Sequence, residues 1–343
     1  MEKLSRNIED YPEGIVLPID KPYRWTSADV IRKVKYAAIK HFGKKNLKVG
    51  HAGTLDPLAT GILLVCIGPA TRRAEELQRS RKRYLAGVSF GATTPSYDLE
   101  KPIDREYPVD GVSEEALRTV LPTFLGEQDQ VAPLFSAKSI DGVRAYETAR
   151  KLFKQGLPVS ETGILQANRI TIYDINLVGF SPAKKTPDQV RGDAQSVEGD
   201  AGGVGGDVKN VGGDSLSVVP DQIGDLTPCA KKGEFAHESP ENYPSVCKNG
   251  GICTQGEGKV SGSPFVDDGK GRIRVADISG YDLPTAMIDV ECSKGTYIRA
   301  LARDLGEALG SGAFLSSLRR IGNGGYTISD AISLDDALHL LAE

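Results

Sequence analysis

The chain contains the stretch Val49-Gly50-His51-Ala52-Gly53-Thr54-Leu55-Asp56-Pro57-Leu58-Ala59-Thr60-Gly61, which places a single carboxylate, Asp56, in a turn rich in glycine. Glycine allows crowded or left-handed backbone, and Pro57 fixes its own φ angle near about −65°, so this turn has a defined shape. The apolar run 62–67 follows at once and predicts a buried strand. An Asp-Pro turn is most often ordinary polar surface. The stretch alone is therefore compatible with a polar turn before a strand or with a carboxylate held at a functional site.

The remaining apolar periodicity predicts a chain of mixed α and β structure. Strands are expected at residues 15–19, 84–91, 169–180 and 285–292, and helices at residues 26–42, 113–124, 145–155, 298–309 and 333–342. Thr26 and Asp29 have the spacing of a capping box, which marks the start of the first of these helices. Because strands and helices mix without regular βαβ alternation, the expected class is α+β, with a mixed, mostly antiparallel sheet flanked by helices.

The segment 181–272 breaks this pattern and is expected to be a disordered, low-complexity insertion rich in Gly and Asp. It holds 17 of the 39 glycines and few large apolar residues, so it cannot bury enough surface to offset the entropy of ordering. The expected organisation is a tail at 1–13, one folded domain in two parts at 14–180 and 273–343, and this insertion between them. Three cysteines and His237 within the insertion fit no standard zinc spacing, so no metal is expected.

The net charge of −4 is concentrated in the insertion. Residues 181–272 contain 14 of the 46 acidic and 10 of the 42 basic residues, so the rest of the chain is neutral. Such a body can still bind RNA through clustered cations. Candidates for phosphate contacts are Arg72, Arg73, Arg79, Arg81, Lys82, Arg83, Lys138, Lys294, Arg299, Arg303, Arg319 and Arg320. No run has the roughly 18 apolar residues of a membrane span, and the N-terminus is polar, so a cytoplasmic protein without membrane contact is expected.

Further motifs accompany the Asp56 stretch in a fixed order. They are Gly14-Ile15-Val16-Leu17-Pro18-Ile19-Asp20-Lys21-Pro22, Trp25-Thr26-Ser27, Lys82-Arg83-Tyr84, Phe90-Gly91-Ala92-Thr93-Thr94-Pro95-Ser96-Tyr97-Asp98, Phe135-Ser136-Ala137-Lys138, Cys292-Ser293-Lys294-Gly295-Thr296-Tyr297-Ile298-Arg299 and Leu318-Arg319-Arg320. Together these motifs resemble the TruB-type tRNA pseudouridine synthases, which isomerise a uridine in the T loop of transfer RNA. The resemblance covers about residues 14–180 and 275–338. It implies the pseudouridine synthase fold.

The resemblance implies catalytic roles for Asp56, Tyr84 and Arg299. The reaction breaks the N1 glycosidic bond, turns the uracil and rejoins it through C5, with no net oxidation or reduction, so neither a cofactor nor a metal is expected. Asp56 is the expected acid or nucleophile, either adding to the sugar or the base or removing a ribose proton. Arg299 is its expected cationic partner. Tyr84 is the expected aromatic platform for the flipped base.

The resemblance also implies contacts with the RNA. Tyr297 is expected to line the pocket, Asp98 to contact the flipped base or nearby polar groups, and Leu318 to form an apolar wall. His51 is expected to contact the RNA near the flipped base. Lys21 is expected to support the architecture of the catalytic turn or to contact a phosphate.

The expected partner is the T arm of transfer RNA, bound by a stand-alone monomer without a guide RNA. Only a short segment follows Arg320, so the C-terminal RNA-binding domain of the PUA type is expected to be missing. Two alternatives stay open. One is an RNA-binding or tRNA-folding protein whose catalysis is dispensable, and the other is a pseudouridine synthase of the same family with a different RNA target.

Deletion of residues 185–268 should leave catalytic activity nearly intact, because the composition of the insertion marks it as peripheral to the folded domain. The measurement compares turnover and tRNA affinity of the deletion variant with those of the full chain. Loss of folding or of tRNA binding on deletion would contradict this prediction.

Overall fold

The computed structural model describes residues 4–136, 139–140, 143–155, 166–183, 265–266 and 273–342. These residues belong to one compact unit, which is formed by residues 1–183 together with residues 244–343. The expected insertion, with its cysteines and His237, lies outside the described residues except for 181–183 and 265–266. The two ends of the chain therefore build one body, within which the residues of the Asp56 stretch can meet those near residue 299.

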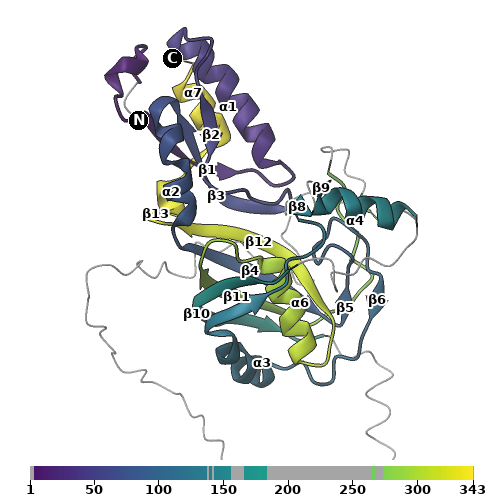
Figure 1. The fold of residues 1–343 in the computed structure, drawn as a ribbon. Coiled ribbons are helices and arrows are strands. Elements are labelled where there is room, and N and C mark those ends of the chain that lie inside the picture. Colours follow the sequence, from purple (N-terminus) through teal and green to yellow (C-terminus); the bar gives the residue numbers. More distant parts are fainter. Residues whose placement is uncertain are drawn as a thin grey trace, which may run out of the picture. The chain divides into compact units, whose positions relative to one another are not determined.

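One large sheet runs through this unit (Figure 1). Among the described residues, eight of its strands follow the order β14-β1-β3-β12-β4-β11-β10-β7, while β2 pairs with β3 and β13 with β12. The strands are β1 (Ile15–Lys21), β2 (Val49–His51), β3 (Ala59–Ile67), β4 (Lys82–Phe90), β7 (Gly126–Gln130), β10 (Asn168–Ser181), β11 (Thr285–Cys292), β12 (Ala313–Asn323), β13 (Tyr326–Thr327) and β14 (Ile332–Ser333). The β1–β14 and β12–β3 pairs are parallel, and the other pairs are antiparallel. The expected mixed, mostly antiparallel sheet of an α+β protein is confirmed.

Helices pack against several parts of this sheet. Those of the described residues are α1 (Ser27–Phe42), α2 (Ala74–Arg79), α3 (Glu114–Val120), α4 (Ala145–Lys154), α6 (Ile298–Ala308) and α7 (Leu334–Leu340), with 3-10 turns η1 (Ile8–Asp10), η2 (Gly68–Arg73), η3 (Leu121–Phe124) and η5 (Ile328–Asp330). Figure 1 shows α1 and α7 together at the part of the sheet with β1, while α3 contacts β10, and α6 contacts the central strands β12 and β4. Two short hairpins, β5 (Ala92–Thr93) with β6 (Arg105–Glu106) and β8 (Ser139–Ile140) with β9 (Val143–Arg144), complete the fold.

The apolar run that follows the Asp56 stretch is the central part of β3. All six residues from Ile62 to Ile67 are fully buried, because both faces of this strand are covered. Leu63, Val65 and Ile67 join the main core beneath α1, while the alternate residues pack in a second cluster with Ala52. Burial on both faces explains why the run is continuously apolar instead of alternating. It also fixes the position of the turn that precedes β3.

Local capping signals place α1 and α7 where the sequence predicts them. Thr26 and Asp29 form the expected capping box at the start of α1, and Gly43 ends the helix with a left-handed φ of 61°. Ser333 caps α7 by accepting a hydrogen bond from the backbone N–H of Asp336. These caps satisfy backbone groups that the ends of a helix otherwise leave without partners.

Strand β12 was not expected. The sequence Ala313–Asn323 contains Ser316, Ser317, Arg319 and Arg320, and these polar residues conceal the strand from any test of apolar alternation. The structure nevertheless inserts β12 between β3 and β4, where it joins the two halves of the sheet. The pairing partners on both sides determine this strand, and they lie far away in the sequence.

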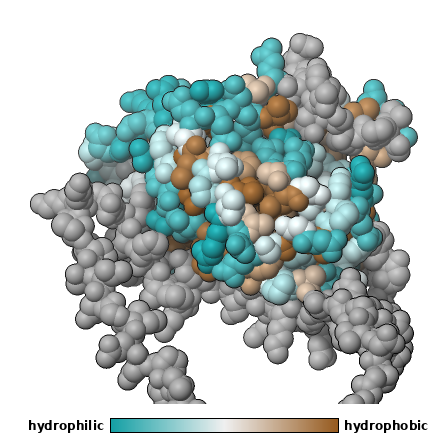
Figure 2. Space-filling view, turned by 90° about the horizontal axis from the view of Figure 1, so that it is seen from below, coloured by the Kyte–Doolittle hydropathy of each residue, from teal (hydrophilic) through white to brown (hydrophobic). Residues whose placement is uncertain are grey.

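Among the described residues, no helix combines the length and the apolar character needed to cross a membrane. Figure 2 shows one face, on which hydrophobic residues form an interrupted patch bordered by hydrophilic residues.

Gly61→Ala should lower the free energy of unfolding by more than about 2 kcal/mol. Gly61 has a φ of +95°, and an added Cβ would lie 2.2 Å from the carbonyl oxygen of Arg320 on the paired strand β12. Gly50→Ala is the matched control from the same stretch, since nothing lies within 4 Å of its added Cβ. Urea unfolding of both variants tests this, and equal stability of the two would contradict the crowding at Gly61.

Candidate active site

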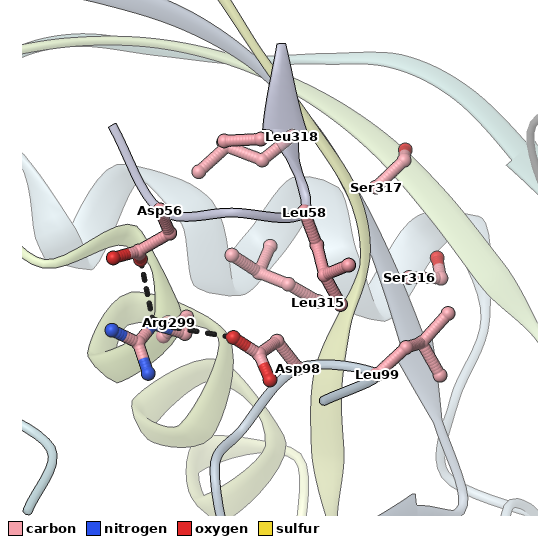
Figure 3. A pocket seen from close by; sticks show the side chains of 10 residues that line it. Asp56, Leu58, Asp98, Leu99, Arg299, Leu315, Ser316, Ser317 and Leu318 are labelled. Carbon is pink, nitrogen blue, oxygen red and sulfur yellow. Dashed lines mark hydrogen bonds and ion pairs between the residues drawn. The ribbon is translucent and has the colours of Figure 1, made fainter. Parts of the chain in front are cut away.

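Asp56, Asp98, Arg299 and Leu318 meet at one pocket, although they come from four distant parts of the chain (Figure 3). Asp56 lies in the turn before β3, Asp98 in the segment after β5, Arg299 in the first turn of α6 and Leu318 in β12. The remaining walls are apolar except for two hydroxyl groups, and are formed by Leu58, Ala59, Leu99, Leu315, Ser316 and Ser317. The pocket therefore combines an apolar wall with a compact group of charges.

Arg299 lies between the two carboxylates. Its Nε atom donates to Oδ2 of Asp56 at 2.9 Å and lies 3.6 Å from Oδ2 of Asp98. Its Nη1 atom donates to the carbonyl oxygen of Ser96 at 3.1 Å. The side chains of Arg299 and Asp98 are only 6% and 9% exposed, whereas that of Asp56 is 37% exposed. Of the three charged groups, Asp56 is thus the one that a molecule entering the pocket can reach.

The buried setting changes the ionisation of the partners of Asp56. Burial raises the pKa of Asp98 to about 6, although the Arg299 guanidinium acts in the opposite direction. Burial also acts to lower the pKa of Arg299, but Asp56 and Asp98 outweigh this and hold that pKa above its usual range. Arg299 therefore stays charged, while Asp98 changes its charge near pH 6.

Lys21 supports the Asp56 turn from the side of β1. Its side chain is fully buried, and Nζ donates to the carbonyl oxygens of Pro22, Trp25 and Pro57 at 2.9, 2.6 and 3.2 Å. Burial lowers the pKa of Lys21 to about 7, and the Asp56 charge partly offsets this. The expected support of the turn is thus present. The expectation that Lys21 contacts a phosphate was wrong, because its ammonium group is enclosed by backbone oxygens.

Arg320 supports the same turn from the side of β12. It is 1% exposed, and its Nε, Nη2 and Nη1 atoms donate to the carbonyl oxygens of Ile62, Gly53 and Thr54 at 2.7, 3.2 and 3.4 Å. Sequence reasoning placed Arg320 among the candidate phosphate contacts, and that was wrong. Arg320 is an internal residue whose guanidinium group donates hydrogen bonds to the backbone around Asp56.

Two more of the candidate phosphate contacts are internal. Lys82 is 5% exposed and donates from Nζ to the carbonyl oxygens of Gln78 and Ser80. Arg299 is 5% exposed and bonded to Asp56. Neither side chain can neutralise a phosphate on the surface. Local charge runs in the sequence did not distinguish these buried cations from exposed ones.

Tyr84 is not among the residues that line the pocket containing Asp56. Its side chain lies in β4, is 9% exposed and packs in the main core. Burial raises the pKa of its hydroxyl, and the nearby Arg320 charge partly offsets the effect. An open platform for base stacking is therefore not visible, and the stacking role of Tyr84 stays a prediction.

Tyr297 and His51 lie near the charged groups of the site. The backbone N–H of Tyr297 donates to Oε1 of Gln130 at 2.8 Å, which fixes the start of α6 immediately before Arg299. His51 lies in β2, and its buried Nδ1 atom has no hydrogen-bond partner among the described residues. Burial lowers the pKa of His51, with a further contribution from Arg320. Neither side chain lines the pocket that contains Asp56.

Sequence reasoning missed several residues of the site. Gln130 and the carbonyl of Ser96 position Arg299, and Leu315, Ser316 and Ser317 line the pocket from β12. The β12 residues were missed because that strand was not predicted. Among the described residues, no group of three or more His, Cys, Asp or Glu side chains could hold a metal ion.

Comparison with known proteins gives one consistent result. The family model described as TruB family pseudouridylate synthase, N-terminal domain, matches residues 39–193, and the model of the tRNA pseudouridylate synthase B C-terminal domain matches residues 299–343. A relative named tRNA pseudouridine synthase B from Phocaeicola vulgatus is 33% identical over 326 residues, which cover 95% of this chain and 92% of the relative. The relative of the same name from Bacteroides thetaiotaomicron is 34% identical over 323 residues, which cover 94% of this chain and 91% of the relative.

Two further similarities are partial. The tRNA pseudouridine synthase B of Bacteroides fragilis is 47% identical over 164 residues, which cover 46% of this chain and 70% of the relative. The solved structure of an H/ACA RNP bound to a substrate RNA containing 2'-deoxyuridine matches with 18% identity and a TM-score of 0.47. That match covers 97% of this chain and 55% of the other, so this chain spans about half the length of that one.

Asp98→Asn should remove the part of the pH dependence of the free energy of unfolding that comes from the Asp98 carboxyl group. The pKa of Asp98 is about 6 in the folded protein against an ordinary 3.8, so the folded state binds more protons between these values. The contribution of Asp98 to the free energy of unfolding therefore falls as pH rises from about 4 to about 6 and is level above that. Because Asn stays neutral, the free energy of unfolding of the variant should rise by about 1–3 kcal/mol relative to that of the unchanged protein as the pH increases across this range.

Urea unfolding of both proteins at several pH values between about 4 and 7 measures this difference. A difference that does not vary with pH would contradict the raised pKa of Asp98.

Proposed function

Because the chain belongs to the TruB family of pseudouridylate synthases, we propose that it isomerises a uridine to pseudouridine in the T loop of transfer RNA. The family models and the relatives named tRNA pseudouridine synthase B support the reaction and the tRNA substrate. The observation that carries the catalytic assignment is the hydrogen bond between the buried Arg299 and the accessible carboxylate of Asp56.

The reaction needs a carboxylate beside the target nucleoside. The N1–C1′ bond breaks, the uracil turns, and a C5–C1′ bond forms; C5 loses a proton and N1 holds one in the product. Asp56 can add to the sugar or the base, or remove a proton from the ribose. Each route needs an oriented carboxylate, and the charged hydrogen bond from Arg299 supplies that orientation. The anchoring of Arg299 on the Ser96 carbonyl restricts its movement further.

The walls of the pocket suit a uracil ring. Leu58, Leu99 and Leu315 give it apolar surfaces, while the Ser316 and Ser317 hydroxyls belong to the same lining. A flipped base loses about a few kcal/mol of stacking, which contact with such surfaces partly restores. We assign Leu318 to the same wall, Asp98 to the control of charge around Arg299, and Tyr297 and His51 to contacts at the rim. Tyr84, although it does not line the pocket, keeps its predicted role as the stacking platform for the flipped base.

Tritium release tests the proposed function directly. A T-arm hairpin carries uridine labelled with tritium at C5, and the exchange of C5–H during isomerisation releases the label into water. The full chain should release one tritium label for each target uridine that it isomerises. Tight binding without release would leave an RNA-binding protein with no isomerase activity, and would overturn the proposal.

Asp56→Asn should reduce tritium release to background, because an amide can act neither as nucleophile nor as base. Its affinity for the RNA should stay within about tenfold of the original, a difference of about 1.4 kcal/mol. Asp110→Asn is the control, since Asp110 is an exposed acid away from the pocket. Turnover retained by Asp56→Asn would refute the assignment of Asp56.

A further inference from the structure

The exposed part of α1 and the turn after it form a strongly basic surface. Between Val30 and Lys45 the sequence has no Asp or Glu and six cations, all exposed. We call this set the α1 basic surface, and it consists of Arg32, Lys33, Lys35, Lys40, Lys44 and Lys45. Its charge contrasts with the net charge of −4 of the whole chain.

Internal ion pairs neutralise little of this charge. Arg32 pairs with Asp29 at 2.8 Å and Lys44 pairs with Glu9 at 2.9 Å, both at exposed positions. Exposed pairs of this kind contribute only about 0–1 kcal/mol and exchange readily for other partners. Lys33, Lys35 and Lys40 have no ion pair with any described residue.

The orientation of α1 presents this charge to solvent. Val30, Val34 and Ala38 are fully buried on one side of the helix and fix its rotation. Tyr36 stands among the cations on the other side and is 77% exposed. Because the apolar side of α1 is used by the core, the helix has no apolar face for a lipid surface, and a membrane is a poor partner.

A groove at the start of α1 borders both the α1 basic surface and the Asp56 turn. Its volume is about 750 Å³, and its lining includes Arg24, Lys33 and Tyr36 together with the acidic Asp29. The backbone N–H of Arg24 donates to the carbonyl oxygen of Pro57 at 2.9 Å, which ties this end of the groove to the turn. Figure 1 shows α1 starting near β3 and extending toward the side where both chain ends lie.

We propose that the α1 basic surface binds the phosphodiester backbone of the substrate tRNA. This inference rests on the proposed function, which makes RNA the ligand. Lys, Arg and Tyr side chains are the usual partners of phosphates, and such contacts position an RNA without reading its sequence. A helix of 16 residues is about 24 Å long, enough to follow the backbone over several base pairs.

The test removes three charges that have no ion pair. The variant Lys33→Gln/Lys35→Gln/Lys40→Gln should weaken tRNA binding at least tenfold at low salt. It should also reduce the slope of log affinity against log salt by up to about three. The control Arg105→Gln/Arg118→Gln/Arg169→Gln removes the same net charge from exposed positions elsewhere, and should keep the original slope.

The rate of catalysis separates this inference from the proposed function. The rate of a single turnover at saturating tRNA should stay unchanged in the α1 variant, because the substitutions weaken RNA binding and leave Asp56 in place. Unchanged tRNA affinity and salt slope, or equal losses in both triple variants, would each overturn the inference. Failure of the proposed function would give a different result, because the unmodified chain would then release no tritium from labelled RNA.

Discussion

The turn that carries Asp56 depends on three buried cations. Lys21 and Arg320 hold its backbone from opposite sides by donating to carbonyl oxygens, and Arg299 holds the carboxylate itself. Burying a charge costs free energy unless hydrogen bonds compensate for it, and the pKa of Lys21, lowered to about 7, reflects that cost. The backbone oxygens of the turn supply the compensation. The turn therefore stabilises the buried cations, and the cations in return hold the turn and Asp56 in one position.

These cations also explain how the sheet relates to the site. Lys21 lies at the end of β1, Arg320 lies in β12, and the turn leads directly into β3, which lies between those two strands. The order of the strands thus brings both cations to the same loop. Arg299 arrives separately, on α6, and its helix start is fixed by Gln130. The pocket forms where these elements meet.

Sequence reasoning reached the elements with strong local signals. Local patterns were enough to predict α1 from its capping box, β3 from its apolar run and α6 from its periodicity. The motif around Asp56 indicated the site. Strand β12 was missed because it owes its place to pairing with β3 and β4, which no local pattern encodes. Lys82 and Arg320 were placed among the surface cations for the same reason, because a local sequence pattern does not show the tertiary contacts that bury them. Burial separates the cations that build the site from those, on α1, that face solvent.

In the proposed reaction, Asp56, oriented by Arg299, isomerises a uridine of tRNA. Chemical mapping of pseudouridine at single-nucleotide resolution, on unmodified tRNA treated with the full chain or with Asp56→Asn, is the decisive measurement. The full chain should produce one modified position, in the T loop, and the variant should produce none. Pseudouridine formed equally by both proteins, or by neither, would contradict the claim.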